Sequence, residues 1–264
     1  MGFLFEKKYV AGKIKYKVLG IKLTLNDKGW KERLSYCPVC RTYEKFRTIR
    51  YNDFHRDNAV CPKCGSLERH RFLYFLYQVL FLNRKDRFSI LHMAPEECLY
   101  RLIVNQDNIE YVPIDLNPEG FPYVENCQKE DVRHLSFPDN SFDYVLSNQI
   151  MEHIDDEQAF IKEILRVLKT DGILILNIPY KQGLENTFED KNIQTEEDRI
   201  KYYYQVDHVR LYGEDTEDRI KKLFPFARVE RISEDFFGKD MIEKMHLSRE
   251  SGALGDMYFL VRKL

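Results

Sequence analysis

The chain has 264 residues, of which 44% are hydrophobic and 14% aromatic, so it can bury one substantial core with a small additional domain. This composition excludes an intrinsically disordered chain. The net charge of −2 conceals an asymmetry, because residues 1–88 carry 20 Lys and Arg against 8 Asp and Glu, whereas residues 89–264 carry 21 against 35. The basic part predicts an anionic partner, although a solvated basic face or a surface docked on the acidic part would give the same balance.

The chain has no apolar run long enough to cross a bilayer. Its first residues lack the apolar stretch and the small-residue cleavage site of a secretory signal. Four of the six cysteines form two C-x-x-C pairs, which suits metal binding in a reducing compartment better than a disulfide framework. We therefore expect a cytoplasmic protein with no membrane span.

Residues 1–35 contain short alternating runs, YVAGKIKYKV and LGIKLTL, with Gly12 and Gly20 at the expected turns. The pattern predicts a basic β-hairpin extension. No residue of this segment is a candidate for catalysis.

The next segment, residues 36–68, carries the cysteine pairs. Two turns that each present two thiolates can close a tetrahedral zinc site with no position left for water, which makes such an ion structural. The predicted ligands are Cys37, Cys40, Cys61 and Cys64. Cys98 and Cys127 have no partner at ligand spacing and are interpreted as small apolar residues.

Residues 69–88 predict a connecting helix, since the stretch LERHRFLYFLYQVLFL can bury a broad face. From residue 89 onward apolar strands alternate with helices, which predicts an α/β fold with a doubly wound, mostly parallel, Rossmann-like sheet. The strongest helix covers residues 156–170, with Gly172 as its stop. Strands are expected at 89–93, 110–116, 142–149, 172–179, 226–232 and 257–264, and further helices from about Pro95 and over 214–223. Residues 180–213 interrupt this rhythm as an insertion.

Several stretches resemble the class I S-adenosylmethionine-dependent methyltransferases, in the branch that has an N-terminal four-cysteine zinc ribbon. They are CPKCGSLERHRFL, ILHMAPE, YVPIDLNP, DVRHLSFPDNSFDYVLSNQIMEHIDD, RVLKTDGILILNIP and QVDHVRLYG. The resemblance covers about residues 37–264. It implies a type 11-like methyltransferase domain over 89–264, a substrate lid over 180–213, S-adenosylmethionine as cofactor and a structural zinc ion.

The loop HMAPEEC (residues 92–98) lies where most relatives have a glycine-rich sequence, yet it contains no glycine. The cofactor has no pyrophosphate to cradle, so Ala94 and nearby backbone N–H groups can suffice. By the resemblance, Asp115 binds the ribose hydroxyls and Asp131 binds the adenine amino group. A carboxylate at the end of a strand is equally common as a helix cap. The expected cofactor contacts are His92, Ala94, Glu96, Asp115, Leu116, Asp131, Val132 and Asn148.

Methyl transfer to a hydroxyl needs a base. The segment QVDHVRLYG predicts His208 as the general base, Asp207 as the residue that orients it, and Arg210 as a contact for an anionic part of the acceptor. The alternative is that these three residues only pin the lid to the body of the protein. The ubiquinone O-methyltransferases bind a divalent ion with an E-x-x-E-H pattern near here, but Gln149 replaces its first glutamate, so the sequence does not indicate a catalytic metal. Glu152 and His153 are instead expected to line the acceptor site or to cap the helix that follows.

Three functions remain open. The leading hypothesis is O-methylation of a small or glycan-related acceptor, such as a sugar or a phosphorylated sugar precursor in polysaccharide biosynthesis. The second is methylation of an RNA base, which the basic first part favours and the acidic second part disfavours. The third is a non-catalytic binding module on a methyltransferase fold.

Overall fold

The computed structural model divides the chain into two compact units, which are described separately. The first comprises residues 1–86, 97–103 and 233–252, and the second comprises residues 87–96, 104–232 and 253–264. Two segments that were expected in the methyltransferase domain, 97–103 and 233–252, thus belong to the first unit. The structure describes residues 5–10, 13–18, 21–26, 34–50, 55–233, 235, 237–248 and 254–264. The expected turns at Gly12 and Gly20 lie outside these ranges.

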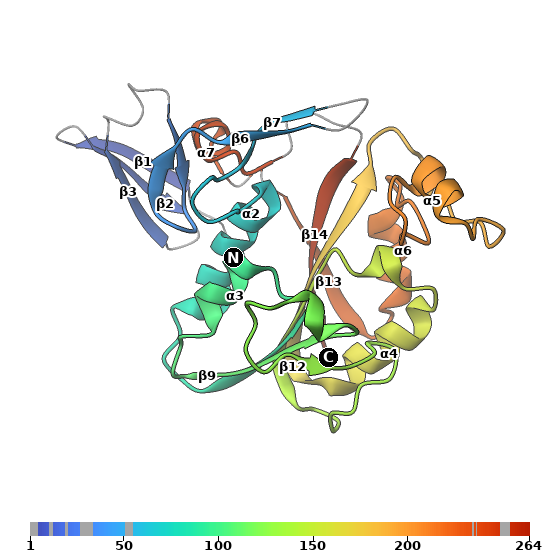
Figure 1. Ribbon diagram of the computed structural model, residues 1–264. Coiled ribbons are helices and arrows are strands. Elements are labelled where there is room, and N and C mark those ends of the chain that lie inside the picture. Colours follow the sequence, from blue (N-terminus) through green and yellow to red (C-terminus); the bar gives the residue numbers. More distant parts are fainter. Residues whose placement is uncertain are drawn as a thin grey trace. The chain divides into compact units, whose positions relative to one another are not determined.

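The first unit begins with an antiparallel sheet of three strands, β1 (Phe5–Val10), β2 (Lys13–Val18) and β3 (Ile21–Asn26), one strand more than the expected hairpin. Two short antiparallel pairs follow, and the second of them is labelled β6 and β7 in Figure 1. They are β4 (Ser35–Cys37) with β5 (Thr42–Glu44), and β6 (Arg47–Arg50) with β7 (His55–Val60). The region expected as a zinc ribbon is therefore built from two hairpins.

The expected connecting helix is present as α2 (Glu68–Tyr77), which continues as one π-helical segment, η1 (Gln78–Leu82). Nearly every side chain of α2 is buried, which explains the density of Leu, Phe and Tyr in its sequence. Phe72 and Phe75 pack against Phe237 within the same unit. Two further helices of this unit are α3 (Glu97–Ile103) and α7 (Lys239–Met245).

The second unit contains a mixed sheet of seven strands in the order β10-β9-β8-β11-β12-β14-β13, with β14 antiparallel to both neighbours. Its strands are β8 (Phe88–Met93), β9 (Ile109–Asp115), β10 (Gln128–Lys129), β11 (Phe142–Asn148), β12 (Leu168–Lys181), β13 (Ala227–Ile232) and β14 (Leu254–Lys263). The order reverses direction between β8 and β11. The expected Rossmann-like α/β fold is confirmed, and ligands bind such sheets beyond the carboxyl ends of the strands at the reversal.

Helix α4 (Glu157–Val167) covers part of this sheet, beside β12 in Figure 1. Asp156 caps it by accepting a hydrogen bond of 3.0 Å from the Ala159 amide, and Phe160 and Ile164 are buried in the core. The helix ends at Val167, because Leu168 is already extended and begins β12. The expected end at Thr170 was therefore wrong.

The insertion after β12 contains one helix, α5 (Glu196–Tyr203), and helix α6 (Thr216–Leu223) follows it. A short 3-10 turn, η3 (Met151–His153), lies just beyond β11, and another, η2 (Pro118–Gly120), follows β9. Among the described residues, no helix combines the length and the apolar character that a bilayer crossing needs.

Candidate functional site

The four cysteines predicted to bind zinc come together in the first unit. All their Sγ atoms lie within 4.8 Å of one another, with 3.6 Å between Cys37 and Cys64 and 3.7 Å between Cys40 and Cys61. Four Zn–S bonds of about 2.3 Å at tetrahedral angles place the sulfurs roughly 3.8 Å apart. None of these cysteines forms a disulfide. The arrangement therefore has the geometry of a closed four-thiolate site.

A buried arginine lies close to this cluster. The guanidinium of Arg71 donates to the backbone carbonyls of Ala59, Ser66, Met245 and His246, and it stacks over Phe46. Its charge also interacts with three of the cysteines. The hydrogen bonds of Cys64 with Cys37 and Ser66 lower the pKa of the Cys64 thiol, whereas the hydrogen bond with Cys64 and burial raise the pKa of Cys37. A cation held by four carbonyls thus offsets negative charge on the sulfurs.

In the second unit a cavity of about 570 Å³ opens at the carboxyl ends of β8, β9 and β11. Its volume is in the range of small-molecule sites. The lining residues come from six stretches of the sequence: Met93, Ala94, Ile114, Asp115, Leu116, Asn117, Glu130, Asp131, Val132, Arg133, Gln149, Ile150, His153, Ile154, Asp155, Arg199, Asp207 and Val209. Five of the eight expected cofactor contacts are among them.

The loop without glycine adopts a conformation that usually favours glycine. Ala94 has φ of 44°, in the left-handed region, and its amide donates to the Ile114 carbonyl at 2.9 Å. Gln149, which also lines the cavity, has φ of 54°. Its side-chain amide donates to Asn177 and to Asp256. Two strained backbone positions thus border one cavity, as is common at functional sites.

The two expected carboxylates lie at this cavity in different environments. Asp115 ends β9 and accepts one hydrogen bond of 2.7 Å from the Asn117 amide, which leaves acceptor capacity on its carboxylate. Asp131 is held by Arg133, whose hydrogen bonds lower the pKa of Asp131. The side chain of Leu116, 53% exposed, is an apolar wall for this cavity.

Three expected cofactor contacts do not line the cavity. His92 is 0% exposed and lies 2.8 Å from the Tyr111 hydroxyl through its Nδ1. Its Nε2 is 3.7 Å from Glu96, which accepts a hydrogen bond of 3.3 Å from Asn148. These side chains form a polar cluster in the interior at the ends of β8 and β11. From the sequence alone, such a cluster cannot be told apart from residues that contact a cofactor.

The predicted catalytic residues are arranged differently from expectation. Asp207 contacts Nδ1 of His153 at 3.2 Å, so its ion pair is with His153 and not with His208. The rings of His153 and His208 meet edge to face with centroids 4.8 Å apart. Burial, with a smaller contribution from His153, lowers the pKa of His208 to about 4. His153 lines the cavity and His208 lies behind it, 3% exposed.

Arg210 is not available to an anionic acceptor, because its buried side chain is fully engaged. It is 1% exposed, donates to the carbonyls of Met151, Ile154 and Asp155, and pairs with Glu189. The expected contact with the acceptor is therefore replaced by a structural role. Arg210 ties the turn after β11 to the insertion.

Arg199, which the sequence analysis did not single out, lies at the cavity where Arg210 was expected to contact the acceptor. Arg199 of α5 lines the cavity and also a neighbouring one of about 890 Å³. No hydrogen bond or ion pair joins its guanidinium to another of the described residues. The isolated Arg at this point of the insertion carries no motif, so only the folded chain reveals it.

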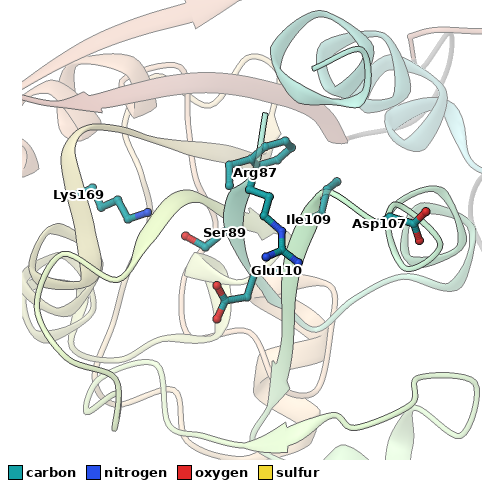
Figure 2. A pocket seen from close by; sticks show the side chains of 7 residues that line it. Arg87, Ser89, Asp107, Ile109, Glu110 and Lys169 are labelled. Carbon is teal, nitrogen blue, oxygen red and sulfur yellow. The ribbon is translucent and has the colours of Figure 1, made fainter. Parts of the chain in front are cut away.

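A different cavity, of about 530 Å³, lies at the amino ends of β8 and β9 (Figure 2). Ser89 of β8, Glu110 of β9 and Lys169 of β12 contribute to it together with Arg87, which directly precedes β8 (Figure 2). Lys169 is paired with Asp143 at 2.7 Å. Since α/β sheets bind ligands at the opposite ends of their strands, the first cavity is the better candidate active site.

A family model described as a methyltransferase domain matches residues 97–176. An uncharacterized protein of Methanocaldococcus jannaschii is 34% identical over 116 residues, which cover 43% of this chain and 51% of that protein. The chain thus spans about half the length of this relative. A probable S-adenosylmethionine-dependent methyltransferase of Mycobacterium tuberculosis is 32% identical over 82 residues, 31% of this chain and 29% of that one.

A solved structure of a SAM dependent methyltransferase from Archaeoglobus fulgidus aligns with 76% of this chain and 96% of its own, at 15% identity and a TM-score of 0.49. The family match includes β9, β11 and α4, and it ends within β12. These elements belong to the mixed seven-stranded sheet of the second unit. Over residues 97–176 the chain is thus similar to a methyltransferase domain.

Proposed function

We propose that the protein is an S-adenosylmethionine-dependent methyltransferase. The observation that carries this proposal is the single cavity that Ala94, Asp115 and Asp131 share at the reversal of strand order. Asp115 would accept hydrogen bonds from the ribose, and Leu116 and Val132 would pack on the adenine ring. When bound, the cofactor supplies an electrophilic methyl group on a sulfonium. The chain's task is then to align an acceptor with that methyl group.

The acceptor atom in this proposal is a hydroxyl oxygen. His153 faces the cavity with Asp207 on its Nδ1, and His208 lies directly behind. A carboxylate that orients an imidazole is the usual arrangement for receiving a proton. The geometry thus supports a base at this cluster and favours His153 over His208 as the group that faces the acceptor, since burial disfavours a charged His208.

The acceptor class that we propose is a small or glycan-related molecule with an anionic group. Arg199 supports this assignment, because its guanidinium lies between the two cavities. A turnover screen of phosphosugars, sugar nucleotides and neutral sugars, followed through S-adenosylhomocysteine, tests the class. We expect Arg199→Leu to raise KM for the active acceptor about tenfold or more with little change in thermal stability. Preference for a neutral acceptor would contradict the assignment.

The cofactor assignment is tested by titration calorimetry with S-adenosylmethionine. We expect Asp115→Ala to weaken binding roughly 100-fold, as loss of two hydrogen bonds to a carboxylate implies. Asp107→Ala is the matched control, because Asp107 is an exposed aspartate that lines the cavity of Figure 2. No measurable binding to the wild-type chain would leave the non-catalytic binding module as the better description.

We also propose that the four cysteines hold a structural zinc ion. The sulfur separations fit a tetrahedral ion, and each C-x-x-C turn provides two of the ligands. Elemental analysis of the purified chain tests this proposal. We expect at least one zinc per chain, retained after brief treatment with a weak chelator.

A second candidate function is the binding of an anionic partner by the first unit. The exposed side chains of Lys8, Lys13, Lys15 and Lys22 lie on one face of the β1–β3 sheet, and Lys8 stands directly opposite Lys15. Like charges in opposite positions destabilise a sheet unless a counter-charge is bound. Binding to bulk RNA that weakens steeply with salt would support an RNA substrate, and absence of binding at low salt would exclude it.

A further inference from the structure

A second group of metal-ligand side chains lies beside the cofactor cavity, in the second unit. One ligand atom from each of Glu152, His153 and His208 lies within 4.8 Å of the other two. Glu152 is 1% exposed and His208 is 3% exposed, whereas His153 lines the cavity. We propose that these three residues bind a divalent transition-metal ion whose open coordination positions face the cavity.

The backbone holds the three ligands in place. Glu152 and His153 belong to η3, directly after β11, and His208 belongs to the insertion after β12. The Val209 amide donates to the Glu152 carbonyl at 2.9 Å, and Arg210 donates to the Met151 carbonyl at 2.7 Å. These bonds join the two segments on both sides of the cluster. The ligand set is therefore preorganised.

Each histidine also has the outer partner that metal-binding histidines commonly have. Asp207 contacts Nδ1 of His153 at 3.2 Å, and His208 hydrogen-bonds the backbone of Tyr203. A carboxylate or a carbonyl on one ring nitrogen fixes the orientation of the imidazole and raises its basicity as a ligand. A cluster that served only to pack the interior would not need an outer partner on each of its two histidines.

The ligand types select the kind of ion. Two imidazoles and one carboxylate suit Zn²⁺, Fe²⁺ or Co²⁺, whereas Mg²⁺ and Ca²⁺ prefer sets made only of oxygen. Three protein ligands leave positions for water or substrate, as in catalytic sites and in contrast to closed four-cysteine sites.

The role of this ion rests on the proposed methyl transfer. An acceptor hydroxyl bound to the ion would lose its proton to solvent more readily, because the ion lowers the pKa of a coordinated oxygen. The resulting alkoxide oxygen forms a bond to the methyl carbon while the C–S bond breaks and its electron pair remains on sulfur. With the ion bound, His153 is a ligand and no longer the base of the proposed function, and the ion takes over the activation of the acceptor hydroxyl.

Cobalt titration of the intact chain, with its tightly bound zinc in place, tests the proposal. We expect one equivalent of Co²⁺ to bind with ligand-field bands but without sulfur-to-cobalt charge transfer, because no thiolate takes part. His208→Ala and Glu152→Gln should each weaken this binding at least tenfold. His134→Ala is the matched control, because His134 is exposed and does not belong to the cluster.

The proposal would be overturned if the wild-type chain did not bind this equivalent of Co²⁺, or if both variants bound it as tightly as the wild-type chain. Folding of each variant is checked by its thermal unfolding and by calorimetry with S-adenosylmethionine. Calorimetry also separates the two proposals, since cofactor binding without cobalt binding contradicts only the metal site. Cobalt binding without cofactor binding contradicts only the methyltransferase function.

Discussion

The four-cysteine cluster and the Glu152, His153 and His208 cluster are both compact groups of metal-ligand side chains, but they differ in their surroundings and in origin. The cysteines come from two short turns, and a charged arginine satisfied by backbone carbonyls lies close to them. The second cluster combines a turn after β11 with the insertion after β12, and it borders a cavity. A closed set stabilises a fold, whereas a set beside a cavity can bind a substrate.

The largest effect is expected when one ligand of the four-cysteine cluster is replaced. Cys37→Ser removes one of four thiolates, and structural zinc contributes about 10 kcal/mol or more to folding in small zinc domains. We expect the purified variant to lose zinc, and residues 34–64 to lose protection from hydrogen exchange. Cys127→Ser is the control, since Cys127 lies outside the cluster. Normal protection without zinc would show that the cysteines act only as core residues.

Replacement of Arg210 tests how much this side chain contributes to joining the turn after β11 to the insertion after β12. Arg210→Leu leaves three buried backbone carbonyls without their donor and removes one of the two arginines that pair with Glu189, which together should cost about 3 kcal/mol. Urea unfolding should show a loss of this size. Arg199→Leu is the comparison variant and should lose less than about 1 kcal/mol. Equal losses would mean that Arg210 has no special structural role.

His246, in the first unit, should make the free energy of unfolding decrease at acid pH. Burial, together with the neighbouring Arg71 charge, lowers the pKa of His246 to about 4, whereas an unfolded histidine has a pKa of about 6.5. The unfolded chain therefore takes up this proton first as the pH falls. The free energy of unfolding should be highest above pH 6.5 and should decrease by up to about 1.4 kcal/mol per pH unit down to pH 4.

His246→Asn should make that decrease shallower. Urea unfolding at pH 7, 6 and 5 measures the slope for both chains. The wild-type chain loses stability between about pH 6.5 and pH 4, where the unfolded ring is protonated and the buried ring is not, so the two free energies of unfolding should converge toward pH 4. An identical slope in the variant would exclude His246 as a source of acid sensitivity.

The smallest expected effect concerns the loop without glycine. Ala94→Gly relieves a left-handed φ that costs an L-residue about 1 kcal/mol, but glycine loses about as much through the entropy of the unfolded chain. We expect the free energy of unfolding to change by less than about 1 kcal/mol and cofactor affinity to be retained. Ala94→Val should be clearly less stable, because a β-branched residue resists this φ. A large gain from glycine would show that the strain is greater than this estimate.

Much of the sheet and the cysteine cluster can be predicted from local sequence. Strands such as Phe88–Met93 and Phe142–Asn148 are buried apolar runs, and their alternation with helices predicts a parallel sheet. C-x-x-C spacing brings two sulfurs together within one turn. Ala94 and Asp115 could be found as well, because Ala94 follows one predicted strand and Asp115 lies at the end of another, and parallel strands end at one edge of the sheet. Asp131 was expected from the family resemblance alone.

The partners of the polar side chains were decided by the tertiary structure. Asp207 precedes His208 in the sequence but pairs with His153, and Arg210 is buried while Arg199 lies at the cavity. His92 and Glu96 belong to a loop at the cavity, yet they lie in a buried polar cluster instead. Local patterns specify which backbone elements form, because they depend on neighbouring residues. Which charged groups meet depends on how segments far apart in the chain are folded against one another.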